Sequence, residues 1–130
     1  MKVLLFNGSP HKNGCTNTAL EEIANTLKEE GIDSEIYQIG TETVSPCRAC
    51  WACAKLGKCV INDKVNDFVE YAAYFDGYIF GSPVHYGSAC GGITAFLDGT
   101  FFVNFVYGKK YVEHKPASAI VSARRSGTRQ

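Results

Sequence analysis

The chain has 130 residues, enough for one domain, and 13 basic side chains balance 13 acidic ones. This zero net charge provides no general attraction to nucleic acid or anionic lipid, so neither is expected as a partner. The 45% hydrophobic content excludes a disordered chain, and no apolar run approaches the ~20 residues that span a bilayer, which makes a cytoplasmic location the default.

Short apolar segments alternate with amphipathic ones along the chain. The predicted elements are, in order, a strand at 2–6, a helix at 16–30, a strand at 35–39, a helix at 65–72, a strand at 77–81, a helix from 89 to about 106 and a strand at 117–121. Strands that alternate with helices favour a parallel sheet with helices on both faces. We therefore predict a single α/β domain over 1–130, doubly wound, with three α/β/α layers.

The polar, basic segment at 122–127 follows the last predicted strand directly. A domain of this class rarely stops just after a strand, so we expect the natural chain to continue with at least one more helix and strand. A naturally short unit of four strands is the alternative.

Ligands of parallel α/β sheets bind beyond the carboxyl ends of the strands, where this chain has three polar, glycine-containing loops. The first loop, 7–17, presents hydroxyls, amides and backbone N–H groups at a helix N-terminus, which suits a phosphate group. The alternative is an ordinary turn in which Thr16 or Asn13 caps the helix. Other phosphate-binding motifs are absent, because no Gly-x-Gly-x-x-Gly follows the first strand and no Gly-Lys-Ser/Thr follows Gly8.

The second loop, 81–88, presents backbone amides, small residues and the ring of Tyr86. A flat heteroaromatic ligand needs such a surface, although a lone tyrosine is more often a half-buried core residue. The third loop, 122–127, contains Arg124 and Arg125. An arginine beside an electron-accepting ring would stabilise the reduced, anionic ring; a solvated surface pair is the alternative.

Four of the six cysteines lie within thirteen residues, as Cys47-x2-Cys50-x2-Cys53-x5-Cys59. A disulfide framework is not expected without a secretory signal. Structural zinc usually takes two cysteine pairs separated by a longer stretch, whereas Cys-x2-Cys-x2-Cys lets one loop wrap three corners of a 4Fe–4S cluster. Cys59 would supply the fourth ligand, with a spacing that departs from the ferredoxin pattern. Zinc, and a loop that holds no metal, are the alternatives.

Together these motifs resemble a known family. Gly8-Ser9-Pro10-x2-Asn13-Gly14-x-Thr16, Gly81-Ser82-Pro83-Val84-x-Tyr86-Gly87 and Ser122-x-Arg124-x2-Gly127 resemble the flavodoxin-like NAD(P)H-dependent FMN reductases, and the cysteine loop resembles that of their iron–sulfur flavoprotein branch. The resemblance covers nearly the whole chain. It implies a flavodoxin-like, doubly wound sheet of order 2-1-3-4-5, of which this chain lacks the C-terminal strand and helix.

The resemblance implies that the first loop holds the FMN phosphate and that the second and third loops flank the isoalloxazine ring. The FMN-binding residues that it implies are Ser9, His11, Asn13, Cys15, Thr16, Asn17, Pro83, Val84, His85, Tyr86, Gly87, Ser88, Ser122, Arg124 and Gly127; the metal ligands are Cys47, Cys50, Cys53 and Cys59. The family often has Arg in place of His11 and Asn in place of Cys15. No protein nucleophile or general base is expected, because the flavin carries the chemistry while His85 and Tyr86 line the substrate side.

The implied function is that of an FMN-dependent oxidoreductase or electron-transfer flavoprotein, with NAD(P)H as electron donor and a small-molecule or protein redox partner. A 4Fe–4S cluster would let FMN divide a two-electron transfer into single steps, and a homo-oligomer, a dimer or tetramer, would bring the loop near a neighbour's flavin. The alternatives are a cluster-free FMN or quinone reductase, a noncatalytic flavodoxin-type carrier and a zinc-stabilised binding module. The zero net charge argues against the strongly acidic face of a carrier.

Overall fold

The computed structural model describes residues 1–108 and 111–126. Its strands are β1 (Lys2–Asn7), β2 (Asp33–Gln38), β3 (Gly77–His85), β4 (Ser88–Ala89) and β5 (Ala117–Ser122), and its helices are α1 (Cys15–Glu29), α2 (Cys53–Leu56), α3 (Lys64–Ala72) and α4 (Gly91–Tyr107). All seven predicted elements are present. The short α2 and β4 were not predicted, and β3 extends beyond its predicted end. No helix in the described ranges is long and apolar enough to cross a membrane.

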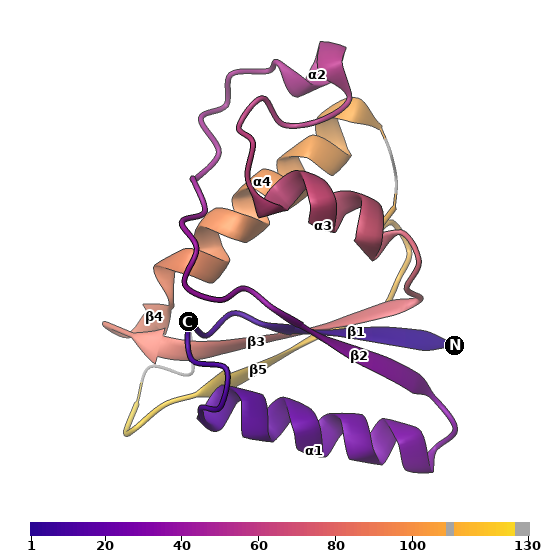
Figure 1. Ribbon diagram of the computed structural model, residues 1–130, viewed down its shortest axis with the longest axis vertical. Helices are drawn as coiled ribbons and strands as arrows, with labels where there is room; N and C mark the ends of the chain where they lie inside the picture. Colours follow the sequence, from indigo (N-terminus) through magenta and orange to yellow (C-terminus); the bar gives the residue numbers. More distant parts are fainter. Residues whose placement is uncertain (109–110, 127–130) are drawn as a thin grey trace.

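The four long strands are parallel and pair in the order β2-β1-β3-β5, and β4 pairs antiparallel with the end of β3. α1 covers one face of the sheet, and α3 and α4 cover the other (Figure 1). This arrangement confirms the predicted three-layer, flavodoxin-like doubly wound fold. Within the part of the chain that the structure describes, β5 pairs only with β3 and is the last element.

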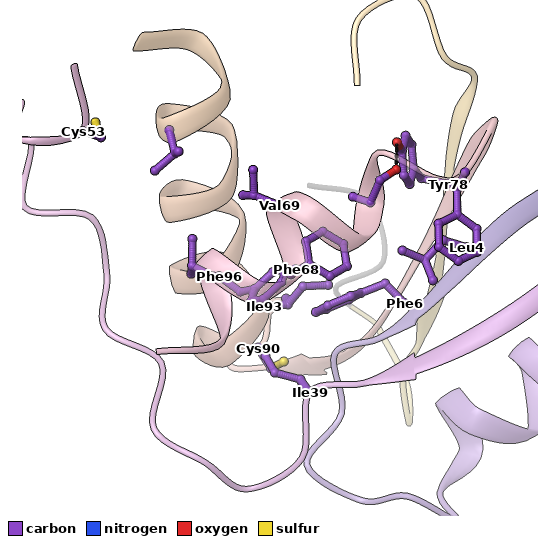
Figure 2. Close-up of a cluster of buried hydrophobic side chains, with 14 residues drawn as sticks. Leu4, Phe6, Ile39, Cys53, Phe68, Val69, Tyr78, Cys90, Ile93 and Phe96 are labelled. Atoms are coloured by element: carbon purple, nitrogen blue, oxygen red, sulfur yellow. Dashed lines mark hydrogen bonds between the residues drawn. The ribbon is translucent and has the colours of Figure 1, made fainter. Parts of the chain in front are cut away.

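Apolar side chains on both faces of β1 build the two halves of the core. Because side chains alternate along a strand, Leu4 and Phe6 point towards α3 and α4, while Val3 and Leu5 point towards α1. The Phe6 ring stacks on Phe96 of α4, with 4.6 Å between the ring centroids. Figure 2 shows Phe6 and Phe96 in the space between the sheet and α4. Burial on both faces explains why the strand is a continuous apolar run.

Tyr78 lies in the α3/α4 half of the core, near the amino end of β3, and its side chain is buried. Its hydroxyl donates to the Ala72 carbonyl at 2.7 Å. Burial, with a smaller contribution from the Asp76 charge, raises the pKa of Tyr78 to about 12. The folded protein therefore holds this proton more tightly than the unfolded chain, whose tyrosines have a pKa of ~10. The resulting stabilisation is complete below pH ~10 and is lost as the pH rises towards 12.

We expect Tyr78→Phe to reduce the loss of unfolding free energy between pH 10 and 12 by about 2 kcal/mol. Urea denaturation at a series of pH values measures this. Tyr71 continues to titrate in the variant, because burial and then its hydrogen bond to Glu35 raise the pKa of Tyr71 to about 12 as well. The pH dependence of the unfolding free energy should therefore be reduced in the variant and not abolished. A variant that loses as much unfolding free energy as the wild type between pH 10 and 12 would contradict the raised pKa of Tyr78.

Candidate functional site

The carboxyl ends of β1, β3 and β5 lie at one edge of the sheet and bring the three predicted loops together (Figure 1). The Gly8 N–H donates to the Gly81 carbonyl at 2.8 Å, which joins the first loop to the second. The hydroxyl oxygens of Thr16 and Ser122 lie 2.8 Å apart, which joins the first loop to the third. The structure thus assembles the three loops as one site.

Two glycines make this close approach sterically feasible. A Cβ atom at Gly8 would lie 2.8 Å from Ile93 Cβ and 2.9 Å from the Gly81 carbonyl oxygen. A Cβ atom at Gly81 would lie 2.9 Å from Thr16 Cγ2. Each distance is shorter than nonbonded carbon contacts allow, so the glycines of the first two motifs are required by packing between β1, β3, α1 and α4.

The N-terminus of α1 is available to an anion. Its N-cap is Gly14, no side-chain cap hydrogen bond is formed, and the first turn contains no acidic residue. Neither Thr16 nor Asn13 therefore acts as the cap that the alternative interpretation required. The first-turn N–H groups and the positive end of the helix dipole are left to a ligand such as phosphate.

The predicted phosphate residues differ in exposure. Ser9, Thr16 and Asn17 are buried, whereas His11, Asn13 and Cys15 are exposed. The buried residues hold the loop through hydrogen bonds within the protein, in which the Ser9 hydroxyl acts as an acceptor and keeps its own proton to donate. The exposed ones present their side chains to solvent and are free to approach a ligand. Contact of either group with FMN stays a prediction.

The second loop is shorter than expected, because β3 continues through Pro83 and Val84 to His85. The chain then turns at Tyr86 and Gly87, whose φ angles are 52° and 80°, and enters β4 at Ser88. Positive φ at both central residues is the geometry of a tight hairpin. The sequence did not predict this hairpin turn, because tyrosine is an unusual residue at a positive-φ position. The Tyr86 side chain is fully exposed, so it is not a core residue.

A cavity of about 380 Å³ lies between the second and third loops and is lined by Val84, Arg124, Arg125 and Ser126. Both arginines are exposed, so their charges can face a ligand in this space. The predicted residue Gly127 lies outside the described residues. The cavity is where a ring held between the two loops would lie.

The four predicted metal ligands, Cys47, Cys50, Cys53 and Cys59, line one hollow of about 20 Å³ against α4, opposite Gly99. Cys53 is buried, and the other three range from half-buried to exposed. Burial raises the pKa of the Cys53 thiol, and the three neighbouring cysteines add to the increase. The loop therefore brings all four cysteines to the lining of one hollow, and their role as metal ligands stays a prediction.

The four cysteines do not form a ready-made metal site. Nowhere in 1–108 and 111–126 do three Cys, His, Asp or Glu side chains converge as holders of one metal ion. The choice between zinc, which binds sulfur at ~2.3 Å, and a 4Fe–4S cluster, which takes one thiolate at each iron, therefore rests on the cysteine spacing and not on this geometry. The Ala49 N–H donates to Cys47 Sγ at 3.4 Å, the kind of bond that tunes cluster thiolates. Ala49 and Trp51 adopt φ angles of 49° and 59°, which curve the loop between the cysteines.

Three residues near the strand-end loops were not predicted as part of the site: Asn7 and Cys90, which are buried, and Gln38, which is half-buried. Asn7 and Gln38, at the ends of β1 and β2, hydrogen-bond to the backbone of Ser9. Cys90, which precedes α4, donates from its thiol to the Gly8 carbonyl at 3.1 Å. The sequence does show a polar residue at the end of each of these two strands. That pattern predicts a contact between the two residues only when the strands are known to be neighbours.

Comparisons with known proteins identify relatives along the chain. Residues 1–130 match the family described as NADPH-dependent FMN reductase. An iron–sulfur flavoprotein of Methanocaldococcus jannaschii is 35% identical over 98 residues, which are 75% of this chain and 51% of that protein. An iron–sulfur flavoprotein of Methanosarcina thermophila is 32% identical over 98 residues, with the same coverage of 75% and 51%. The chain thus spans about half the length of these relatives.

Solved structures show the same fold. An NAD(P)H:quinone oxidoreductase from Methanothermobacter marburgensis superposes with a TM-score of 0.76 at 15% identity, covering 97% of this chain and 65% of that one. RosB was solved with a bound formylriboflavin-5'-phosphate intermediate and superposes with a TM-score of 0.74 at 14% identity. The superposition covers 98% of this chain and 54% of the RosB chain.

Proposed function

Because this chain belongs to the NADPH-dependent FMN reductase family, we propose that it binds FMN across the three strand-end loops and passes electrons from a reduced nicotinamide to a small-molecule or protein acceptor. The observation that carries the proposal is the uncapped N-terminus of α1. It ends the first loop, and hydrogen bonds tie the first loop to both neighbouring loops. Bound FMN would supply the redox chemistry, and the protein supplies position and charge.

We assign the phosphate to the first loop, where the N–H groups of α1 meet Ser9, His11, Asn13, Cys15, Thr16 and Asn17. The ring is assigned to the cavity between the second and third loops. There Arg124 would place its positive charge beside the ring and favour its reduced form. Pro83, Val84, Gly87, Ser88, Ser122 and Gly127 would shape the ring site, and His85 and Tyr86 would face the substrate.

We also propose that Cys47, Cys50, Cys53 and Cys59 hold a 4Fe–4S cluster. Two relatives are named iron–sulfur flavoproteins, and all four cysteines line one hollow. The thiolates would each bind one iron, while the apolar wall from α4 limits access of water. A cluster-free reductase of FMN or quinones is the alternative, in which the loop has no redox role.

The proposed cluster and flavin sites lie at different positions along α4 (Figure 1). Cys90, whose thiol donates to Gly8 of the first loop, precedes α4. The cysteine hollow touches the helix at Gly99, Phe102 and Val103. At 1.5 Å per residue these positions are about 14–20 Å apart. That distance favours a homo-oligomer, a dimer or tetramer, in which the loop of one subunit approaches the flavin of another. The expected cytoplasmic location stays a prediction.

Equilibrium dialysis of the anaerobically purified protein against FMN tests the central proposal. We expect uptake at micromolar FMN, with reduction of the bound flavin on addition of NADPH or NADH. No uptake would contradict the proposal. Uptake without reduction by either nicotinamide would instead favour a noncatalytic carrier, and zinc with no flavin would favour a binding module.

A further inference from the structure

A chain of hydrogen-bonded amides lies beneath the first loop. Asn17 Nδ2 donates to Glu21 Oε1 at 2.7 Å, and Asn7 Nδ2 donates to Asn17 Oδ1 at 3.3 Å. Asn7 Nδ2 also donates to Gln38 Oε1 at 2.7 Å. Gln38 Nε2 then donates to the Ser9 carbonyl at 2.6 Å, and Asn7 Oδ1 accepts from the Ser9 N–H at 3.0 Å. The amides therefore connect β1, β2 and α1 to the peptide groups of one serine.

The Glu21 carboxylate sets the direction of this chain. An ionised carboxylate only accepts hydrogen bonds, so Asn17 turns its NH2 group to Glu21 and its oxygen to Asn7. Asn7 in turn presents its NH2 group to Asn17 and Gln38, and its oxygen to Ser9. Reversing any one amide would set two donors or two acceptors against each other. Because Asn7 is 0% exposed, water cannot satisfy the mismatched groups, and the observed orientation is favoured.

Ser9 consequently has both backbone groups occupied, its N–H by Asn7 and its carbonyl by Gln38. Its hydroxyl oxygen accepts from the His11 N–H at 3.2 Å. A hydroxyl that already accepts one hydrogen bond still has its own proton to donate. A donor at this place in the loop, near the uncapped first turn of α1, suits an oxygen of a phosphate group.

We propose that Asn7 and Gln38 are positioning residues for the flavin phosphate and act through Ser9, whose hydroxyl, and not its backbone N–H, contacts the phosphate. The inference rests on the proposed function, because it requires FMN as the ligand. FMN and riboflavin differ only in the phosphate. Gln38 therefore contributes to the preference for FMN over riboflavin, a discrimination that a merely structural residue would not affect.

The test compares FMN with riboflavin in matched variants by fluorescence titration. Gln38→Met keeps the side-chain length and removes the donor to Ser9. We expect its Kd for FMN to rise about 10-fold, the equivalent of one lost hydrogen bond, and its Kd for riboflavin to change by less than about 2-fold. Glu35→Gln is the control, because Glu35 lies three residues before Gln38 on β2 and its carboxylate pairs with Lys2. It should alter neither Kd.

Combination with Ser9→Ala shows whether Gln38 acts through the serine. Ser9→Ala alone should raise the Kd for FMN about 10-fold, and adding Gln38→Met should change it by less than about 2-fold more. If Gln38→Met fails to fold, Gln38→Glu replaces it, since its oxygen would face the Ser9 carbonyl. Two results would overturn this inference and leave the proposed function intact: effects of the two substitutions on the Kd for FMN that multiply, or equal losses of affinity for FMN and riboflavin. A wild-type chain that binds neither flavin overturns the proposed function as well.

Discussion

Replacement of Cys53 by serine is expected to remove iron and acid-labile sulfide from the anaerobically purified protein while FMN stays bound. Cys53 is the buried member of the four cysteines that line the hollow. A serine hydroxyl is a poor substitute for a thiolate at iron. Iron content should fall from about four atoms per chain to below about one. FMN should be retained, because the hollow contacts α4 well away from the strand-end loops.

Cys15→Ser is the matched control for this experiment. Cys15 is also a free cysteine, but it lies at the start of α1, outside the hollow. Its replacement should leave iron and sulfide unchanged. Wild-type protein with flavin and no iron would select the cluster-free reductase, and zinc in place of iron would select a structural metal site.

Gly8→Ala is expected to lower the free energy of unfolding by about 3 kcal/mol, at the upper end of the usual overpacking cost. The new methyl group would lie 2.8 Å from Ile93 Cβ and 2.9 Å from the Gly81 carbonyl oxygen. These two atoms cannot move aside as the end of a flexible side chain can, because one belongs to the backbone and the other is the Cβ atom of a branched side chain. Relief of the clash would break the bond from Gly8 to Gly81 that joins the first two loops. The Kd for FMN should therefore rise more than about 10-fold. Urea denaturation and flavin titration measure the two effects.

Gly91→Ala provides the comparison, because a Cβ atom at Gly91 would meet no heavy atom within 4 Å. Gly91 is the first residue of α4, where alanine is a better helix former. This variant should be as stable as the wild type or more stable by about 0.5 kcal/mol. If Gly8→Ala behaved in the same way, the packing argument for the first motif would be wrong.

The long elements could be predicted because burial imposes a period on them. β1 is apolar throughout because both faces are covered, and α1 repeats Leu20, Ile23 and Leu27 on the side that meets the sheet. The short elements carry no such signal. α2 has four residues, ended by Gly57 at φ 71°. The turn at Tyr86 and Gly87 has a glycine at only one of its two positive-φ positions, and the pairing of β4 with β3 holds Tyr86 at the other.

The candidate site also has parts that could be predicted from the sequence and parts that could not. The cysteine spacing predicts a shared loop, and in the structure all four cysteines line one hollow. The loops follow strands, so their meeting at one edge could also be predicted. The amide pair of Asn7 and Gln38 could not, because their contact joins residues 31 positions apart. Such a pair depends on which strands are neighbours, a property of the whole sheet.

β5 pairs with β3 along one side only in the part of the chain described, and most of its side chains are exposed. An open strand edge offers unpaired N–H and C=O groups to any extended segment of another molecule. Self-association of a 130-residue preparation through this edge would increase with protein concentration and would be insensitive to salt. Light scattering over a dilution series would therefore separate such aggregation from assembly through a specific interface.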